Sequence, residues 1–250
     1  MQEFSDLLKL METLRGEKGC PWDKKQTLES FKTFLLEEVY ELLEAIDKND
    51  SQALKEELGD LLFHIVFICQ ICKEEGRFEM KDVVVGTYNK MVKRHPHVFL
   101  NEKIKEPIPK RWEEIKKEEK ENYSLLRNIP KEMPALLRAY VITKKVSRVG
   151  FDWEKVEDVF SKLNEEIEEL KEAQRLSDKK KIEEEIGDLL FTAVNLARFL
   201  GIEPEDALRK AIDKFIDRFS YIERKIDLNS STQKTMDELW EERKDMERGR

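Results

Sequence analysis

Apolar side chains recur every three or four residues along most of this chain, which is the spacing of one face of an α-helix. The segment 4–14, for example, has apolar residues at positions 4, 7, 8, 11 and 14. No segment stands out with the apolar–polar alternation of a half-buried strand. The pattern therefore predicts an all-α chain. Further helices are predicted over residues 27–47, 51–75, 81–94, 111–121, 134–149, 154–176, 178–200, 204–226 and 235–247.

One acidic pattern occurs twice. The first repeat reads Glu37-Glu38-Val-Tyr-Glu41 and, on the next predicted helix, Glu57-Leu-Gly-Asp60. The second repeat reads Glu165-Glu166-Ile-Glu-Glu169 and then Glu185-Ile-Gly-Asp188, at one constant offset. Internal repetition of this kind indicates two similar structural units. We therefore expect two tandem helical-bundle repeats.

The segment between the repeats differs in composition. Prolines 107 and 109 interrupt residues 101–110, and the predicted helix that follows is highly charged with a thin apolar edge. We therefore predict an N-terminal helical domain over 1–100, a charged helical linker over 101–149 and a C-terminal helical domain over 150–250.

Four acids of each repeat lie at the apolar stripe of their helix. Glu38, for example, lies one turn from both Phe34 and Leu42. Buried carboxylates are rare unless they are paired or bound to a metal, and four together would repel one another without a cation. Oxygen ligands select a hard cation, here Mg²⁺ with Mn²⁺ as a substitute. The candidate ligands are Glu38, Glu41, Glu57 and Asp60 and, in the second repeat, Glu166, Glu169, Glu185 and Asp188.

A pair of basic residues also recurs, on the third predicted helix of each repeat. The pairs are Lys90 with Arg94 and Lys214 with Arg218, each spaced i, i+4 so that both charges share one helix face. A metal with lysine and arginine nearby suits a polyphosphate, whose oxygens need several positive partners. The alternative interpretation is a solvated basic pair on the surface.

Gly59 and Gly187 stand in mid-helix, directly before the last aspartate of each repeat. Glycine there costs about 1 kcal/mol relative to alanine. The sequence leaves two explanations open, which are close approach of a second helix or close approach of a ligand.

Two other candidate metal motifs are weaker. Cys69 and Cys72 have C-x-x-C spacing, but they lie in an apolar helical run that favours core thiols. His64 follows Asp60 by four residues, whereas di-iron bundles use Glu-x-x-His, and the second repeat has Thr192 at the matching position.

The composition of the chain argues against nucleic-acid polymers and membranes as binding partners. The formal net charge is −8, which does not favour binding to a nucleic-acid polymer or an anionic membrane surface. No run reaches the roughly 18 apolar residues of a membrane span, and the N-terminus lacks the features of a signal peptide. We therefore expect a soluble, cytoplasmic protein.

The acidic motifs EExxE and ExxD resemble the signature of the all-α nucleoside triphosphate pyrophosphatases. Other segments, in order over nearly the whole chain, resemble the MazG family within that group. They are Cys20-Pro-Trp-Asp23, Leu35-Leu-Glu-Glu-Val-Tyr-Glu41, Lys93-Arg-His-Pro-His-Val-Phe99, Arg111-Trp-Glu-Glu-Ile-Lys116, Pro134-Ala-Leu-Leu-Arg-Ala139 and Val149-Gly-Phe-Asp-Trp153. The resemblance implies a helical bundle, a homodimer and Mg²⁺-dependent hydrolysis of nucleoside triphosphates, including deoxynucleotides, to monophosphate and pyrophosphate.

The resemblance also implies roles for individual residues. The eight acids named above match the family's metal ligands. Lys214 and Arg218, with Trp240 in the last helix, match its nucleotide contacts, and Lys90 and Arg94 are their counterparts in the first repeat. We further predict that Glu165 orients the attacking water. Since both acid patterns are intact, the sequence leaves open which repeat is active.

Two other functions remain open at this point. One is a non-catalytic nucleotide-sensing or metal-sensing scaffold, which would bind a triphosphate and release it unchanged. The other is hydrolysis of an alarmone nucleotide rather than of ordinary triphosphates.

Overall fold

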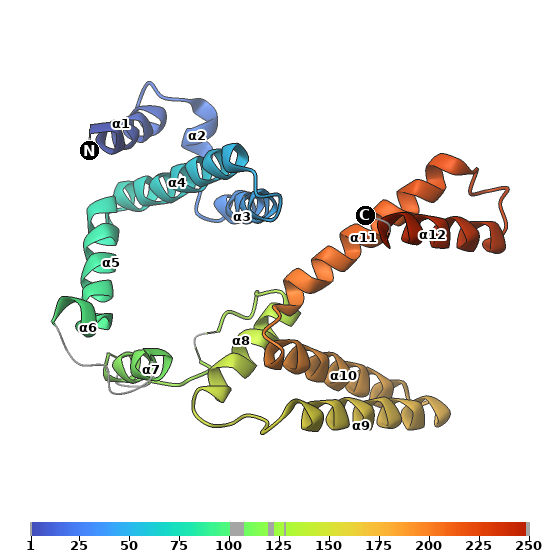
Figure 1. The fold of residues 1–250 in the computed structure, drawn as a ribbon. Coiled ribbons are helices and arrows are strands. Elements are labelled where there is room, and N and C mark those ends of the chain that lie inside the picture. Colours follow the sequence, from blue (N-terminus) through green and yellow to red (C-terminus); the bar gives the residue numbers. More distant parts are fainter. Residues whose placement is uncertain (1, 101–107, 120–122, 128, 249–250) are drawn as a thin grey trace. The chain divides into compact units, whose positions relative to one another are not determined.

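The computed structural model describes residues 2–100, 108–119, 123–127 and 129–248. Every regular element in these ranges is an α-helix (Figure 1), which confirms the all-α prediction. The chain divides into unit 1, Met1–Ile104, and unit 2, Lys105–Arg250. Both helices that begin within the predicted linker belong to unit 2, and the predicted domain boundaries stay a prediction. Within the described ranges, no helix has the length and apolar composition that a membrane crossing requires.

Unit 1 is built on a helical hairpin. Its helices are α1 (Gln2–Arg15), α2 (Pro21–Lys25), α3 (Phe31–Asp47), α4 (Ser51–Glu74), α5 (Met80–Arg94) and α6 (Pro96–Phe99). α3 and α4 pack along each other, α1 packs on α4, and α5 has limited contacts with α4 and α6. The core between α1, α3 and α4 contains Met11, Phe31, Val66, Phe67 and Ile71.

Unit 2 repeats the hairpin and adds an arm. Its helices are α7 (Ile108–Glu118), α8 (Ala135–Ser147), α9 (Val156–Arg175), α10 (Lys179–Phe199), α11 (Pro204–Lys225) and α12 (Gln233–Arg248). α9 and α10 pack along each other, and α8 packs on α10 and α11. α11 then runs away from the hairpin, and α12 folds back along it (Figure 1).

The two hairpins share one turn. Asn49 and Ser177 have left-handed φ angles of 51° and 53°, which end the first helix of each pair. The next residue, Asp50 or Asp178, caps the second helix by accepting hydrogen bonds from two backbone N–H groups. The same turn therefore sets the same register, which brings the acids of the two helices face to face.

The predicted helix starts differ from the structure near the first repeat. α3 begins at Phe31 rather than near Thr27, because residues 28–30 form a turn. Thr27 and Ser30 exchange side-chain and backbone hydrogen bonds of 3.0 and 3.2 Å, and the Phe31 N–H donates to the Thr27 carbonyl at 3.1 Å, so this turn caps the start of α3. The segment between the first two predicted helices contains the short helix α2.

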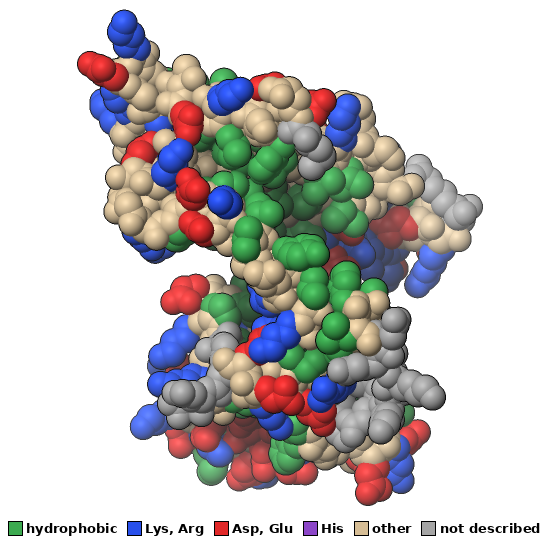
Figure 2. All heavy atoms as spheres, turned by 90° about the vertical axis from the view of Figure 1, so that its left-hand side faces the viewer, with side chains coloured by type: hydrophobic (Ala, Val, Ile, Leu, Met, Phe, Trp, Pro, Cys, Tyr) green, Lys and Arg blue, Asp and Glu red, His purple; other side chains and the backbone are tan. Residues whose placement is uncertain are grey.

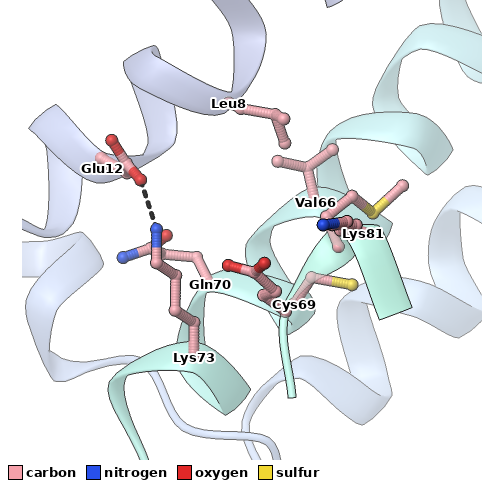
Figure 3. Close-up of a pocket in the computed structure, with 9 residues that line it drawn as sticks. Leu8, Glu12, Val66, Cys69, Gln70, Lys73 and Lys81 are labelled. Atoms are coloured by element: carbon pink, nitrogen blue, oxygen red, sulfur yellow. Dashed lines mark hydrogen bonds and ion pairs between the residues drawn. The ribbon is translucent and has the colours of Figure 1, made fainter. Parts of the chain in front are cut away.

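A cavity of about 190 Å³ lies between α1, α4 and α5 (Figure 3). Leu8 and Cys69 line it, and Lys73 Nζ donates a hydrogen bond to Glu12 Oε1 at 2.6 Å beside it. Cys69 and Cys72 are both buried, and burial followed by the neighbouring thiol raises the pKa of Cys69. The C-x-x-C pair is thus part of the core of unit 1, and no acid of the repeats lines this cavity.

Many large apolar side chains are exposed on the hairpins, and Figure 2 shows apolar groups gathered on one face. In unit 1 they include Leu36, Tyr40, Leu58 and Leu62, and in unit 2 they include Ile186, Leu190 and Phe191. Ile212 and Phe215 are exposed on α11. Apolar patches of this kind mark surfaces that bind a partner. In the described part of the chain, these apolar side chains are left exposed by the other helices of the same unit.

Candidate metal and phosphate site

The second acid cluster consists of Glu166 on α9 with Glu185 and Asp188 on α10. One carboxylate oxygen of each lies within 4.8 Å of the others. Glu166 is 4% exposed and Glu185 is 1% exposed. Glu185 Oε2 is buried and has no hydrogen-bond partner in the described part of the chain. Three converging carboxylates, one with an unsatisfied buried oxygen, fit a hard divalent cation.

The first acid cluster consists of Glu38 and Glu41 on α3 with Glu57 on α4, again with oxygens within 4.8 Å. Burial raises the pKa of Glu38, and the charges of Asp60 and Glu41 raise it further. Burial and then Glu41 and Asp60 likewise raise the pKa of Glu57. Without a cation, these carboxylates repel one another.

In each unit the structure brings three of the four predicted metal ligands together. The acid that lies outside the cluster stands at a different position of the motif in the two units. Asp60 lies outside the first acid cluster and Glu169 outside the second. Both remain within electrostatic reach, since burial and the charges of Glu185 and Glu166 raise the pKa of Glu169. Half of the eight acids are exposed in the described part of the chain, namely Glu41, Asp60, Glu169 and Asp188.

Two lysines in the second acid cluster were missed by the sequence analysis. Lys162 Nζ lies 2.9 Å from Glu166 Oε1 and donates to Glu165 Oε1 at 2.6 Å. Lys181 Nζ lies 2.6 Å from Glu185 Oε1, a hydrogen bond that raises the pKa of Lys181 to about 12. Each lysine stands four residues before a buried acid, a spacing that the sequence displays. Glu165, the predicted water-orienting acid, is exposed beside Lys162.

The first acid cluster has no such lysines. The matching positions hold Phe34 and Ala53, and within the described ranges no lysine or arginine forms an ion pair with Glu38. His64 Nδ1 lies 4.0 Å from Glu38 Oε1 and has no hydrogen-bond partner among the described residues. Burial lowers the pKa of His64, so that the ring is neutral near pH 7. The two clusters therefore differ in how their negative charge is balanced.

This difference predicts a pH-dependent stability. The raised pKa of Glu57 means that the folded chain binds more protons than the unfolded chain between pH 4.5 and the raised value, so stability falls as pH rises through that window. Without metal, Glu57→Gln is expected to unfold at a higher temperature than the parent at pH 7. The gap should close as the pH falls towards 4.5, which calorimetry in the presence of a chelator measures.

Glu185→Gln is the matched control, because Lys181 already balances Glu185. It should give no such gain in unfolding temperature. Equal gains from the two substitutions would contradict the explanation by unbalanced charge.

The predicted nucleotide contacts of the second repeat meet on the arm formed by α11 and α12. The Arg218 guanidinium lies 5.4 Å from the centre of the Trp240 ring, and Phe215 lies 5.1 Å from the same ring. Glu247 accepts hydrogen bonds from Arg218, the shortest at 2.6 Å, which raises the pKa of Arg218 and lowers that of Glu247. Lys214 is exposed on the same helix and also lowers the pKa of Glu247. Arg218, a predicted nucleotide contact, is thus paired with a carboxylate in this structure.

The structure does not bring the basic pairs to the acid clusters within either unit. α11 packs on α8 and α12 and touches α10 only briefly, and α12 packs on α11. In unit 1, Lys90 and Arg94 lie on α5, which leaves the hairpin at the end of α4. The expectation that each basic pair lies beside its acid cluster is therefore not met within one unit, because the third helix diverges from the hairpin.

Comparison with known proteins agrees with these features. Residues 26–99 and 154–222 each match the model of the MazG nucleotide pyrophosphohydrolase domain. The chain belongs to the MazG family. A nucleoside triphosphate pyrophosphohydrolase/pyrophosphatase MazG of Thermotoga maritima is 46% identical over 96% of this chain and 95% of its own length. A nucleoside triphosphate pyrophosphohydrolase of Escherichia coli K12 is 44% identical over 99% of both chains.

The two MazG segments coincide with the two repeats, so the prediction of tandem repeats is confirmed. Each segment contains one acid hairpin and its basic pair. α12 lies beyond the second MazG segment, and with it Trp240 and Glu247.

Proposed function

We propose that the chain is a Mg²⁺-dependent hydrolase that converts nucleoside and deoxynucleoside triphosphates into monophosphate and pyrophosphate, and that the second repeat carries the main activity. Membership of the MazG family supports the reaction class. The observation that carries the assignment to the second repeat is the acid cluster of Glu166, Glu185 and Asp188, with its two lysines. An alarmone hydrolase would release other products, and a non-catalytic sensor would release no product.

Glu166, Glu185 and Asp188, with Glu169 beside them, would hold Mg²⁺, with Mn²⁺ as a substitute. The ion would supply charge neutralisation at the α-phosphate and a bound water of lowered pKa. Glu165, which is exposed and one residue from Glu166, orients the attacking water and accepts its proton.

Basic residues act on the phosphates. Lys162 and Lys181 are long side chains at the rim of the acid cluster, and they turn from the carboxylates to phosphate oxygens when a cation takes their place. Lys214 and Arg218 stabilise the charge that develops on the leaving pyrophosphate. Trp240 presents a flat aromatic surface beside Arg218, suited to a nucleobase.

In the first repeat, Phe34 and Ala53 stand where the second has lysines, which removes two phosphate contacts. The same four-acid pattern can therefore bind metal in both repeats, while only the second provides a charged cradle for a triphosphate. Lys90 and Arg94 remain candidate phosphate contacts for the first repeat.

Isotope labelling tests which bond is cut. A cation held by the acid cluster would neutralise charge at the α-phosphate while Lys214 and Arg218 bind the distal phosphates, so water is expected to attack the α-phosphorus and pyrophosphate to leave. Hydrolysis in ¹⁸O-labelled water is expected to place the label in the monophosphate, as read by mass spectrometry. Label in pyrophosphate would show attack at the β-phosphorus, and diphosphate with orthophosphate as products would exclude a pyrophosphohydrolase. A sensor would return the triphosphate unlabelled.

The ion pair of Arg218 with Glu247 gives a separate test. If the carboxylate competes with phosphate, Glu247→Gln is expected to tighten binding of inorganic tripolyphosphate about fivefold, the effect of a partly exposed ion pair. Calorimetric titration measures it. Asp217→Asn is the control, since Asp217 ties α12 to α11 through Arg243 at 2.6 Å. If Glu247 only anchored α12, both substitutions would weaken binding.

A homodimer is part of the same proposal. The family resemblance implies it, and the exposed apolar side chains of both hairpins support it.

A further inference from the structure

We propose that Lys162 and Lys181 act as internal counter-ions that keep a free divalent cation out of the second acid cluster, so that this repeat takes up its cation together with the triphosphate. The first acid cluster has no such lysines and binds the cation by itself. The two repeats therefore differ in the order in which cation and nucleotide bind. The inference rests on the proposed function, because it concerns how that same site is filled.

The first observation is the balance of charge in the second acid cluster. Lys162 Nζ lies 2.9 Å from Glu166 Oε1, and Lys181 Nζ lies 2.6 Å from Glu185 Oε1. Both acids are buried, so two of the three carboxylates of the cluster have a positive partner before any cation arrives. A cation that enters alone has to displace these ammonium groups, which lowers its apparent affinity.

Each lysine also has a second, exposed acid to which it can turn. Lys162 donates to Glu165 Oε1 at 2.6 Å, and Lys181 lies 3.4 Å from Glu184 Oε2. A lysine that leaves the cluster therefore keeps a carboxylate partner or takes a phosphate oxygen in its place. With the lysines in position, Glu185 Oε2 is still buried without a hydrogen-bond partner among the described residues. The lysines thus balance the charge of the cluster without satisfying its oxygens, which leaves the cluster ready for a cation that arrives with phosphate.

The second observation is that the first acid cluster lacks these partners. Phe34 and Ala53 stand at the positions of the two lysines, and within the described ranges no lysine or arginine forms an ion pair with an acid of this cluster. His64 Nδ1 lies 4.0 Å from Glu38 Oε1, and even a protonated imidazole would balance only one of three carboxylates. A free cation here relieves repulsion and displaces no ammonium group.

The surface around Lys181 is open. A depression of the surface is lined by Lys181, Glu184 and Gly187, among other residues of α10. A Cβ atom added at Gly187 would meet nothing within 4 Å among the described residues, and the same holds for Gly59. Close packing of two helices of one unit therefore does not explain either glycine. In the second repeat, the open surface leaves room for Lys181 to turn away from Glu185 and for a polyphosphate to approach.

Binding of Mn²⁺ alone tests the order of binding. Electron paramagnetic resonance measures free Mn²⁺ during titration of the metal-free full chain without nucleotide. We expect the first acid cluster to bind Mn²⁺ about tenfold more tightly than the second, the combined effect of two partly exposed ion pairs. Glu57→Gln should remove the tighter binding, whereas Glu185→Gln should leave it unchanged.

Exchange of the lysines gives a sharper test. In a chain that carries Glu57→Gln, the double variant Lys162→Ala/Lys181→Ala is expected to bind Mn²⁺ about tenfold more tightly than the chain with both lysines. In the parent chain, Ala53→Lys places an ammonium group four residues before Glu57 and should weaken the tighter binding about threefold.

Lys180→Ala is the matched control, because it removes one positive charge from the same part of α10. Lys180 is exposed and, in the described part of the chain, forms no ion pair with an acid of the cluster. This variant should leave the affinity for Mn²⁺ unchanged.

Calorimetric titration with inorganic tripolyphosphate adds a second measurement. The Glu57→Gln chain is expected to bind the Mg²⁺ complex of tripolyphosphate at least about tenfold more tightly than tripolyphosphate without Mg²⁺. The double variant Lys162→Ala/Lys181→Ala should lose affinity for this complex while it gains affinity for Mn²⁺ alone. A purely structural role of the lysines would not move the two affinities in opposite directions.

Equal affinity of the two clusters for Mn²⁺, or no gain when Lys162 and Lys181 are removed, would overturn the inference. The proposed function would stand in that case, because it is tested by the products of hydrolysis. If neither cluster bound Mn²⁺ even with tripolyphosphate present, the proposed function at this site and the inference would fail together. Should the lysine double variant not fold, as judged by circular dichroism, Ala53→Lys decides, because it adds the ion pair to the other repeat.

Discussion

Glu185→Gln is expected to lower Mg²⁺-dependent turnover of a triphosphate by more than about a hundredfold. This loss is larger than the loss of activity usually seen when a residue that only hydrogen-bonds to a metal ligand is replaced. The side chain is 1% exposed and belongs to the second acid cluster, and its Oε2 is buried without a hydrogen-bond partner among the described residues. Glutamine keeps the shape of the side chain but removes its charge, so the loss reports on cation binding rather than on packing. Lys181 is half exposed and can turn to solvent, so the helices should remain folded.

The comparison is Glu57→Gln, the same change at the matching position of the first repeat. We expect it to retain most of the turnover, while the double variant should be as inactive as Glu185→Gln alone. Steady-state kinetics over a range of Mg²⁺ concentrations separates loss of metal affinity from loss of rate. If Glu57→Gln abolished turnover and Glu185→Gln did not, the main activity would belong to the first repeat.

Arg218→Ala is expected to lower kcat/KM about a hundredfold or more, as removal of a group that stabilises transition-state charge does. The guanidinium is held between Glu247 and the Trp240 ring, so its position is fixed before a ligand arrives. Lys214→Ala should have a smaller effect, since its exposed side chain is positioned by fewer contacts.

Arg243→Ala controls for the position of α12. Arg243 links α12 to Asp217 of α11 at 2.6 Å, whereas the guanidinium that lies over the Trp240 ring is that of Arg218. A loss as large as that of Arg218→Ala would mean that anchoring of the arm, rather than the charge of Arg218, determines the rate. Comparison of kcat/KM for the three variants decides between these explanations.

Local signals allowed the sequence to predict much of this fold. The hairpin turn follows from Asn49 and Asp50, whose side chains favour a left-handed helix end and an N-cap, and the same chemistry recurs at Asp178. Helical periodicity then placed Glu166 and Glu185 on facing sides of two neighbouring helices, where the structure finds them. These features depend on residues close together in the chain.

The direction of α11 could not be predicted in the same way. It depends on tertiary contacts such as the bond from Leu137 N–H to Glu205, between residues far apart in sequence. Periodicity also could not show that Asp60 and Glu169 fall outside the tight clusters, because this depends on side-chain conformation. Lys162 and Lys181 were visible in the sequence, but their role required knowing that the acids four residues later are buried.

Glu247 has a consequence for the end of a catalytic cycle. α12 holds the Glu247 carboxylate beside Arg218, so this carboxylate has an effective local concentration of the order of millimolar or higher. A dissolved anion must compete with that concentration to bind Arg218. A metal-bound triphosphate can do so through several simultaneous contacts, whereas each hydrolysis product keeps only some of them. If the proposed function holds, the return of Glu247 to Arg218 would weaken the binding of pyrophosphate, and the chain would carry its own competitor against its product.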